Sequence, residues 1–177
     1  VSDLFSAQQG HAEQWQVCLA HQLRDCTFAI DAGDTVLAPR IKLILLRICA
    51  ICRRRGRLAD STLRQYRAEI DRRLDAALAL KPSNRHGIRL RRRFAACRDN
   101  LSLCLTDPTV PPTNNASERD IRPSAIFRKV TNGFRSTWGR DLYAGVRSVI
   151  NTARRQHISA FAAISQTLAP TPIRDTS

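Results

Sequence analysis

The sequence predicts a mainly α-helical protein. Three segments, 40–55, 60–78 and 138–156, place apolar residues at spacings of three and four, which is the period of one helix face. Gly33 and Gly56 fall between predicted helices, where glycine favours a turn or a helix end. Hydrophobic residues make up 43% of the 177 positions, so the chain can bury a core and is not expected to be disordered.

The first thirty residues mix strand and helix signals. Asp3 is expected to end a strand whose start lies before the first residue, and the polar segment 6–14 is predicted to be helical. Apolar and aromatic residues in 15–19 predict a short strand. Residues 21–30 are predicted to form a helix with Leu23, Cys26, Thr27 and Ile30 on one face.

The segment 40–55 is the most apolar predicted helix. Leu43 and Leu46 widen its apolar stripe, so we expect it to be buried on most sides and to end at Gly56.

Residues 60–105 predict an antiparallel helical hairpin. Asp60 or Ser61 is expected to cap the first helix, the segment 82–84 turns the chain, and a return helix runs over about 85–105. The residues expected to face inward are Leu63, Tyr66, Ile70, Leu74, Leu78, Ile88, Phe94, Cys97, Leu101 and Cys104 or Leu105.

The C-terminal part predicts a strongly amphipathic helix over 138–156 and a short last helix capped by Ser159. The residues expected to be buried in the longer helix are Leu142, Val146, Val149, Ile150 and Ala153.

The net charge of +14 comes from 26 arginines and 3 lysines against 15 acidic residues. Such an excess indicates a polyanionic partner or serves solubility alone. The run 81–93 has no acidic residue, and Arg91, Arg92 and Arg93 stand at its end. This run is either a solvated helix face or a surface that contacts the DNA backbone.

Six cysteines lie mostly in apolar periodic segments, which favours free buried thiols in a reducing cytoplasm. Cys49 and Cys52 form a CxxC pair, but no second pair or nearby histidine completes a zinc site, so packing is favoured over metal binding. No apolar run reaches 18 residues, so no membrane span is predicted.

One stretch, 111–123, holds a single carboxylate, Glu118, among basic residues. Its two prolines hold the approach extended, Asn114 or Asn115 can cap a short helix, and Pro123 is expected to end that helix at Arg122. Glu118 then has two readings. It either closes a capping box with Asn115 and pairs with Arg122, or binds a metal ion beside phosphates.

The pattern Asn114-Asn115-x-x-Glu118-Arg119-x-x-Arg122-Pro123, followed by Arg128-Lys129, resembles the signature of DDE transposases of bacterial insertion sequences, the insertion-sequence-66 family. The resemblance continues through residues 131–136 and covers the upstream segment 17–25.

This resemblance implies the C-terminal part of an RNase H-like α/β catalytic domain interrupted by a large all-helical insertion. Residues 1–25 would be the remnant of the catalytic core and 26–106 the insertion. Residues 107–140 would carry the catalytic Glu motif and a basic segment, and 141–177 the C-terminal helices and tail.

The resemblance also implies chemistry. Glu118 corresponds to the third catalytic carboxylate and Asp3 to the second, and the complete site would hold two Mg²⁺ ions. No candidate for the first Asp is present, so the 177-residue chain alone is expected to be inactive. The side chains expected to contact DNA are Arg91, Arg92, Arg93, Arg119, Arg122, Arg128 and Lys129.

By the same resemblance the protein is expected to act as a homo-oligomer on DNA, in a bacterial cytoplasm and associated with the nucleoid. The alternative from the residues alone is a basic, all-helical module that binds nucleic acid or serves assembly without catalysis.

Overall fold

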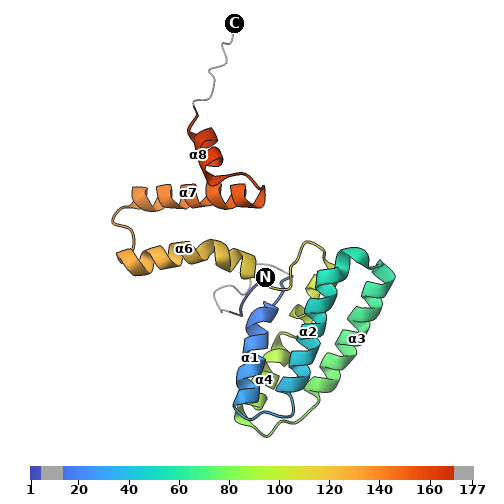
Figure 1. Cartoon of the computed structure of the whole chain (residues 1–177). Helices are drawn as coiled ribbons and strands as arrows, with labels where there is room; N and C mark the ends of the chain where they lie inside the picture. Colours follow the sequence, from blue (N-terminus) through green and yellow to red (C-terminus); the bar gives the residue numbers. More distant parts are fainter. Residues whose placement is uncertain (5–13, 170–177) are drawn as a thin grey trace. The chain divides into compact units, whose positions relative to one another are not determined.

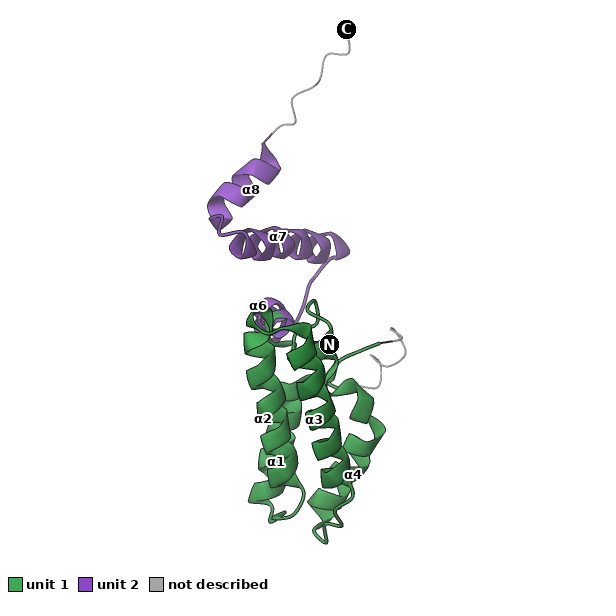
Figure 2. Cartoon of the chain, turned by 90° about the vertical axis from the view of Figure 1, so that its right-hand side faces the viewer, with its two compact units in different colours: residues 1–116 green, residues 117–177 purple. Residues whose placement is uncertain are grey.

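The computed structural model describes residues 1–4 and 14–169, and this part of the chain is mainly helical, which confirms the predicted class (Figure 1). The chain divides into two compact units, residues 1–116 and 117–177, which Figure 2 colours separately. The helices are α1 (Leu19–Asp31), α2 (Ala38–Arg54), α3 (Asp60–Leu78), α4 (Arg85–Ala96), α5 (Leu103–Thr106), α6 (Asn115–Thr131), α7 (Thr137–Arg155) and α8 (Ala160–Leu168), with short 3₁₀ turns η2 (Arg55–Arg57) and η3 (Arg98–Asn100).

The strand predicted over 15–19 is wrong. Val17 forms only an isolated parallel bridge with Ser2, and Leu19 already begins α1. No strand lies in the described ranges, so the expected RNase H-like sheet stays a prediction. The helix predicted over 6–14 falls, except for Gln14, outside the described residues.

The core of the first unit forms around α2, which packs against α1, α3 and α5. Figure 1 shows α1 and α3 beside it. Ile41, Leu45 and Ile48 are fully buried in it. The expectation that α2 is buried on most sides is wrong, because Leu43 and Leu46 are 68% and 45% exposed. The neighbouring helices cover the Ile41 side of α2, and the opposite side meets solvent.

The α2 N-terminus is capped from a loop that the sequence did not single out. Asp34 is only 1% exposed, and its carboxylate accepts the backbone N–H groups of residues 36, 37 and 38 at 3.2, 3.4 and 2.8 Å. These are donors that a helix start leaves unpaired, so the carboxylate satisfies them and complements the helix dipole. Gly87 of α4 lies against this carboxylate, because a Cβ built there would come within 2.8 Å of both oxygens.

The hairpin expected over 60–105 forms in part. The stripe of α3 packs as predicted, with Ile70 and Leu74 fully buried. Asp60 is the first helical residue of α3 and not its cap, since Ala59 holds the N-cap position and no side-chain cap bond forms. In α4, Phe94 is buried as expected, whereas Ile88 is 47% exposed and the prediction for it is wrong.

The single return helix to about 105 is also wrong, because α4 ends at Ala96 and is followed by η3 and α5. Segment 15–17 explains the break. The backbone carbonyl of Asn100 accepts the N–H of Val17 at 2.8 Å, and the Asn100 amide donates to the carbonyl of Trp15 at 3.1 Å. Residues 98–104 thus bond to a distant segment where a continuous helix would bond to itself.

In the second unit α6 runs through Pro123 to Thr131, so the prediction that the helix ends at Arg122 is wrong. Pro123 cannot donate to the carbonyl of Arg119, which costs one helical bond. Contacts beyond the proline offset this loss. The ring of Phe127 stacks on Phe134 at 5.0 Å and on Tyr143 of α7 at 4.8 Å between centroids.

The predicted helix over 138–156 is confirmed as α7, but the burial of its stripe is not. Leu142 and Val146 are 52% and 38% exposed, and only Ala153 of the expected set is buried. The described part of the second unit holds three helices, which is too few to enclose that face. The cap at Ser159 is confirmed, since its hydroxyl accepts the N–H of Ala162 at 3.1 Å.

Candidate catalytic carboxylates and nucleic-acid interface

Four segments that are distant in the sequence meet in the first unit, around residues 2, 16–19, 101–104 and 112. Cys18 donates its N–H to the carbonyl of Ser2 at 2.7 Å, and Leu19 donates to the carbonyl of Pro112 at 2.9 Å. Gln16 is fully buried among them: its amide donates to the carbonyl of Leu101 at 3.0 Å, and its side-chain carbonyl accepts the N–H of Cys104 at 3.0 Å. The start of the 111–123 stretch is therefore tied to the segment that bears Asp3.

Asp3, the predicted second carboxylate, directly follows the bridged residue Ser2 and is half-buried. The backbone of Ser2 is held on both sides, because its N–H donates to Gln16 at 2.8 Å and its carbonyl accepts from Cys18. This pairing fixes the backbone next to the Asp3 carboxylate. The structure leaves the catalytic role of Asp3 a prediction.

Glu118 lies in the first turn of α6 and is half-buried. On a helix, residues four and eleven positions further lie on nearly the same face, so Arg122 and Lys129 share the face of Glu118. Both basic side chains are exposed. The helix thus aligns one carboxylate with two cations, an arrangement that can hold a metal ion or phosphate oxygens side by side.

The other predicted cations of this unit lie around the same helix. Arg128 and Lys129 line a shallow hollow of about 370 Å³ whose remaining walls are Ala125, Asn132 and Gly133. Asn132 and Gly133 have positive φ angles of 58° and 103°, so the chain turns in the left-handed conformation directly after α6. Arg119 is exposed on the flank of the helix.

The opposite side of α6 is used for packing within the unit. Asp120 forms an ion pair with Arg155 of α7, and Phe127 stacks on Tyr143. These contacts hold α6 against α7 through residues that lie opposite Glu118 around the helix.

The three arginines predicted to contact DNA from α4 are not equivalent. Arg91 donates to the carbonyl of Leu78 at 2.8 Å, and Arg93 pairs with Asp25 at 2.7 Å, so both have partners in the fold. Arg92 is exposed and lies on one helix face with two arginines outside the predicted set, Arg85 and Arg89, which are exposed as well.

This Arg85–Arg89–Arg92 stripe could have been found from the sequence, because its spacing of four and three residues is helical. Choosing the three consecutive arginines overlooked that adjacent helical residues point in different directions.

Arg55 is a residue that sequence reasoning missed. Its guanidinium donates to the backbone carbonyls of Cys104, Asp107 and Pro108, which lie shortly before the 111–123 stretch. A local pattern cannot signal such a contact, because the partners lie about fifty residues away.

The six cysteines are free thiols. Cys52 of the CxxC pair lies with its sulfur 2.9 Å from that of Cys104. The hydrogen bond between the two thiols lowers the pKa of Cys52, with help from the nearby Arg55, and raises the pKa of Cys104. No group of three His, Cys, Asp or Glu side chains that could hold a metal ion is found within the described residues.

Comparison with known proteins gave one family. The model of the family described as Transposase IS66 family matches residues 1–141, which is more than half of the chain and includes both Asp3 and Glu118. The searches of curated proteins and of solved structures found no match. In the described residues no helix is long and apolar enough to span a membrane.

Proposed function

Because the chain belongs to the IS66 family of transposases, we propose that it takes part in cutting and joining DNA strands during transposition of an insertion sequence. The observation that carries the proposal is the face of α6, where Glu118 shares one side with the exposed Arg122 and Lys129. A carboxylate next to cations is what phosphoryl transfer on DNA needs from a protein, because this chemistry depends on positioning and charge stabilisation.

The type of ligand atom that these residues offer suits Mg²⁺. Asp3 and Glu118 offer hard carboxylate oxygens, and Mg²⁺ is commonly held by one or two carboxylates with waters and substrate phosphates completing its shell. The number of ligands is small, because no group of three His, Cys, Asp or Glu side chains that could hold a metal ion is found in the described part of the chain. When bound, two such ions would polarise the scissile phosphate and activate the attacking oxygen.

The chain's own residues have separate roles in this proposal. Asp3 and Glu118 would each contribute one ligand. Arg122 and Lys129 would hold backbone phosphates next to Glu118, and Arg119 and Arg128 would extend this contact along α6. Asp120 and Phe127 would keep the helix in its orientation through α7.

Replacing Glu118 by Gln tests this assignment, because the amide keeps the shape and the hydrogen-bonding reach of the carboxylate but loses its charge. In an assay of strand cleavage and joining by the active transposase, E118Q should abolish the reaction and leave DNA binding and thermal stability unchanged. Glu69→Gln is the matched control, since Glu69 of α3 pairs with Arg47 of α2 and Arg73 of α3. Full activity of E118Q would leave only the capping-box role.

Metal binding gives a second readout that does not need activity. Titration of the chain with Mn²⁺ as a spectroscopic substitute for Mg²⁺, in the presence of DNA, should show weaker binding for E118Q than for E69Q. Equal Mn²⁺ affinities of the two variants would show that Glu118 is not a metal ligand.

The Arg85–Arg89–Arg92 stripe favours a second candidate function, a non-catalytic basic helical module that binds DNA or serves assembly. Both candidates predict binding that is largely independent of sequence and weakens with salt. The slope of log K against log salt is about −0.9 for each phosphate contacted on duplex DNA.

Replacing the three stripe arginines by Ala should make this slope shallower. The same change at Arg53, Arg54 and Arg57, which are exposed at the end of α2 and in η2, removes an equal charge and should leave the slope nearly unchanged. Equal effects of the two triple variants would mean that net charge alone attracts DNA. If only E118Q loses catalysis while its DNA binding is intact, the protein is an enzyme and not only a DNA-binding module.

A further inference from the structure

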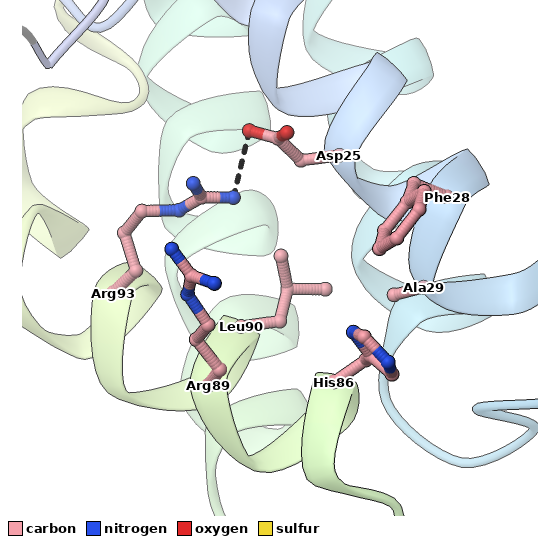
Figure 3. A pocket seen from close by; sticks show the side chains of 7 residues that line it. All are labelled: Asp25, Phe28, Ala29, His86, Arg89, Leu90 and Arg93. Carbon is pink, nitrogen blue, oxygen red and sulfur yellow. Dashed lines mark hydrogen bonds and ion pairs between the residues drawn. The ribbon is translucent and has the colours of Figure 1, made fainter. Parts of the chain in front are cut away.

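A small hollow lies between α1 and α4 of the first unit (Figure 3). Its volume is about 160 Å³. The residues that line it are Asp25, Phe28, Ala29, His86, Arg89, Leu90 and Arg93.

The two walls of the hollow differ in chemistry. Figure 3 shows the ring of Phe28 on the α1 side and the guanidinium groups of Arg89 and Arg93 on the α4 side, with Leu90 between them. The carboxylate of Asp25 holds Arg93 at 2.7 Å. For Arg89 no hydrogen bond or ion pair is found among the described residues, so its guanidinium is available to an incoming group.

Phe28 is 61% exposed, so its ring is accessible to a ligand. Its ring meets His86 at 79° with 5.2 Å between centroids, so the two rings are not stacked on each other. His86 is itself fixed, because its ring nitrogen Nε2 accepts from Arg85 at 3.0 Å and its backbone N–H donates to Asn84 at 2.7 Å. The His86 ring, which the Phe28 ring contacts, is therefore fixed by two hydrogen bonds of its own residue.

Size and chemistry together restrict the ligand. Pockets for whole small molecules usually measure about 300–1,000 Å³, so this hollow suits one flat ring of a larger molecule. An aromatic ring and a guanidinium that line one hollow are both groups on which a nucleic-acid base can stack, and proteins that bind single strands combine such groups with basic grooves along the backbone.

We propose that this hollow, named here the Phe28 pocket, binds one unpaired base of single-stranded DNA, with the base against Phe28 and Arg89 and the adjoining phosphates along the Arg85–Arg89–Arg92 stripe. Arg89 belongs to both the pocket and the stripe, so a strand that follows the stripe passes the mouth of the pocket. The inference rests on the proposed action on DNA and assigns a place to a strand that has left the duplex.

Binding of the 177-residue chain to a fluorescent oligo-thymidine strand of about 16 nucleotides tests the proposal, with a duplex and an abasic strand of equal length beside it. Stacking of one base contributes about 1–3 kcal/mol, so Phe28→Ala should weaken binding to the thymidine strand by about 5- to 150-fold. The abasic strand and the duplex should bind Phe28→Ala as well as they bind the parent chain.

Two further variants test whether the loss of binding is specific to the Phe28 pocket. Phe161→Ala removes a phenylalanine that is 83% exposed on α8 and should change none of the three affinities. Arg89→Lys keeps the charge but loses the flat guanidinium, so it should weaken binding to the thymidine strand and leave the abasic strand nearly unaffected. Thermal melting of each variant verifies that the fold is intact.

Two results would refute the proposal that the Phe28 pocket binds a base. One is an unchanged affinity of Phe28→Ala for the thymidine strand. The other is an equal loss on all three DNAs, which would mean that the ring acts through folding and not through a base. If the parent chain binds none of the DNAs at low salt, the proposed function itself fails, and that outcome is distinct from both.

Discussion

Gly87 is the position where one added methyl group should test the packing of the first unit most directly. A Cβ at this residue would lie 2.7 Å from the Cγ of Asp34 and 2.8 Å from each carboxylate oxygen. Asp34 cannot move away freely, since its oxygens hold three backbone N–H groups at the start of α2 and its side chain is buried.

The expected cost of Gly87→Ala combines three effects. Overpacking of a buried site costs about 1–3 kcal/mol, and disturbing a helix cap costs about 0.5–2 kcal/mol. Alanine gains about 1 kcal/mol over glycine inside a helix. The net expectation is a loss of roughly 0.5–4 kcal/mol of unfolding free energy.

The matched control is Gly145 in α7, where nothing lies within 4 Å of an added Cβ. There the same substitution should stabilise the helix by up to about 1 kcal/mol. The two substitutions are thus expected to change the unfolding free energy in opposite directions, although both replace a helical glycine by alanine.

Urea unfolding followed by the fluorescence of Trp15 measures the first unit alone when Trp138 of α7 is replaced by Phe. Circular dichroism in the same titration follows helix loss for Gly145→Ala. A double variant with Asp34→Ala adds a second check, because both changes act on one carboxylate and should cost less together than the sum of the single costs. A neutral or stabilising Gly87→Ala would refute the close packing of α4 on Asp34.

Two other predictions concern titrating groups. A mild disulfide oxidant such as oxidised glutathione should take two electrons and two protons from Cys52 and Cys104, whose sulfurs lie 2.9 Å apart, and peptide mapping should find this cross-link. Cys26 and Cys97 should stay reduced, because burial raises their pKa values to about 12 and about 11 and the thiolate is the reacting form; a cross-link through either would contradict the structure. Arg98 holds the pKa of Asp75 below its ordinary value of 3.8 through two bonds of 2.9 Å, so the pair stabilises the fold above that value and its contribution is lost as the pH falls through the lowered pKa. Asp75→Asn should therefore lower the melting temperature at pH 7 and approach the parent chain in acid; a difference that is constant with pH would exclude the pair as its cause.

The sequence by itself determined the class of the fold and several of its helices. Apolar residues at spacings of three and four placed α2, α3 and α7 within a few residues of their ends, and a serine before the last helix identified its cap. These features are local, because a helix bonds residues four apart and a cap satisfies the first free N–H groups. The 111–123 motif also pointed to the transposase family, which the comparison confirmed over residues 1–141.

Only the tertiary structure decided which faces are covered and where helices stop. Leu43 and Leu142 fit their apolar stripes but lie exposed, because no described helix of their own units covers them. The return helix breaks after Ala96 because bonds to residues 15–17 replace its own.

The same holds for the candidate sites. Asp3 and Glu118 came from a motif, and their catalytic roles stay predictions, whereas the Phe28 pocket came from helices whose facing side chains lie about sixty residues apart. Contacts between distant segments depend on how helices pack, and the periodicity of a single helix does not encode its neighbour. The sequence therefore supplied the charges and rings, and packing alone brought Phe28 and Arg89 to the same hollow.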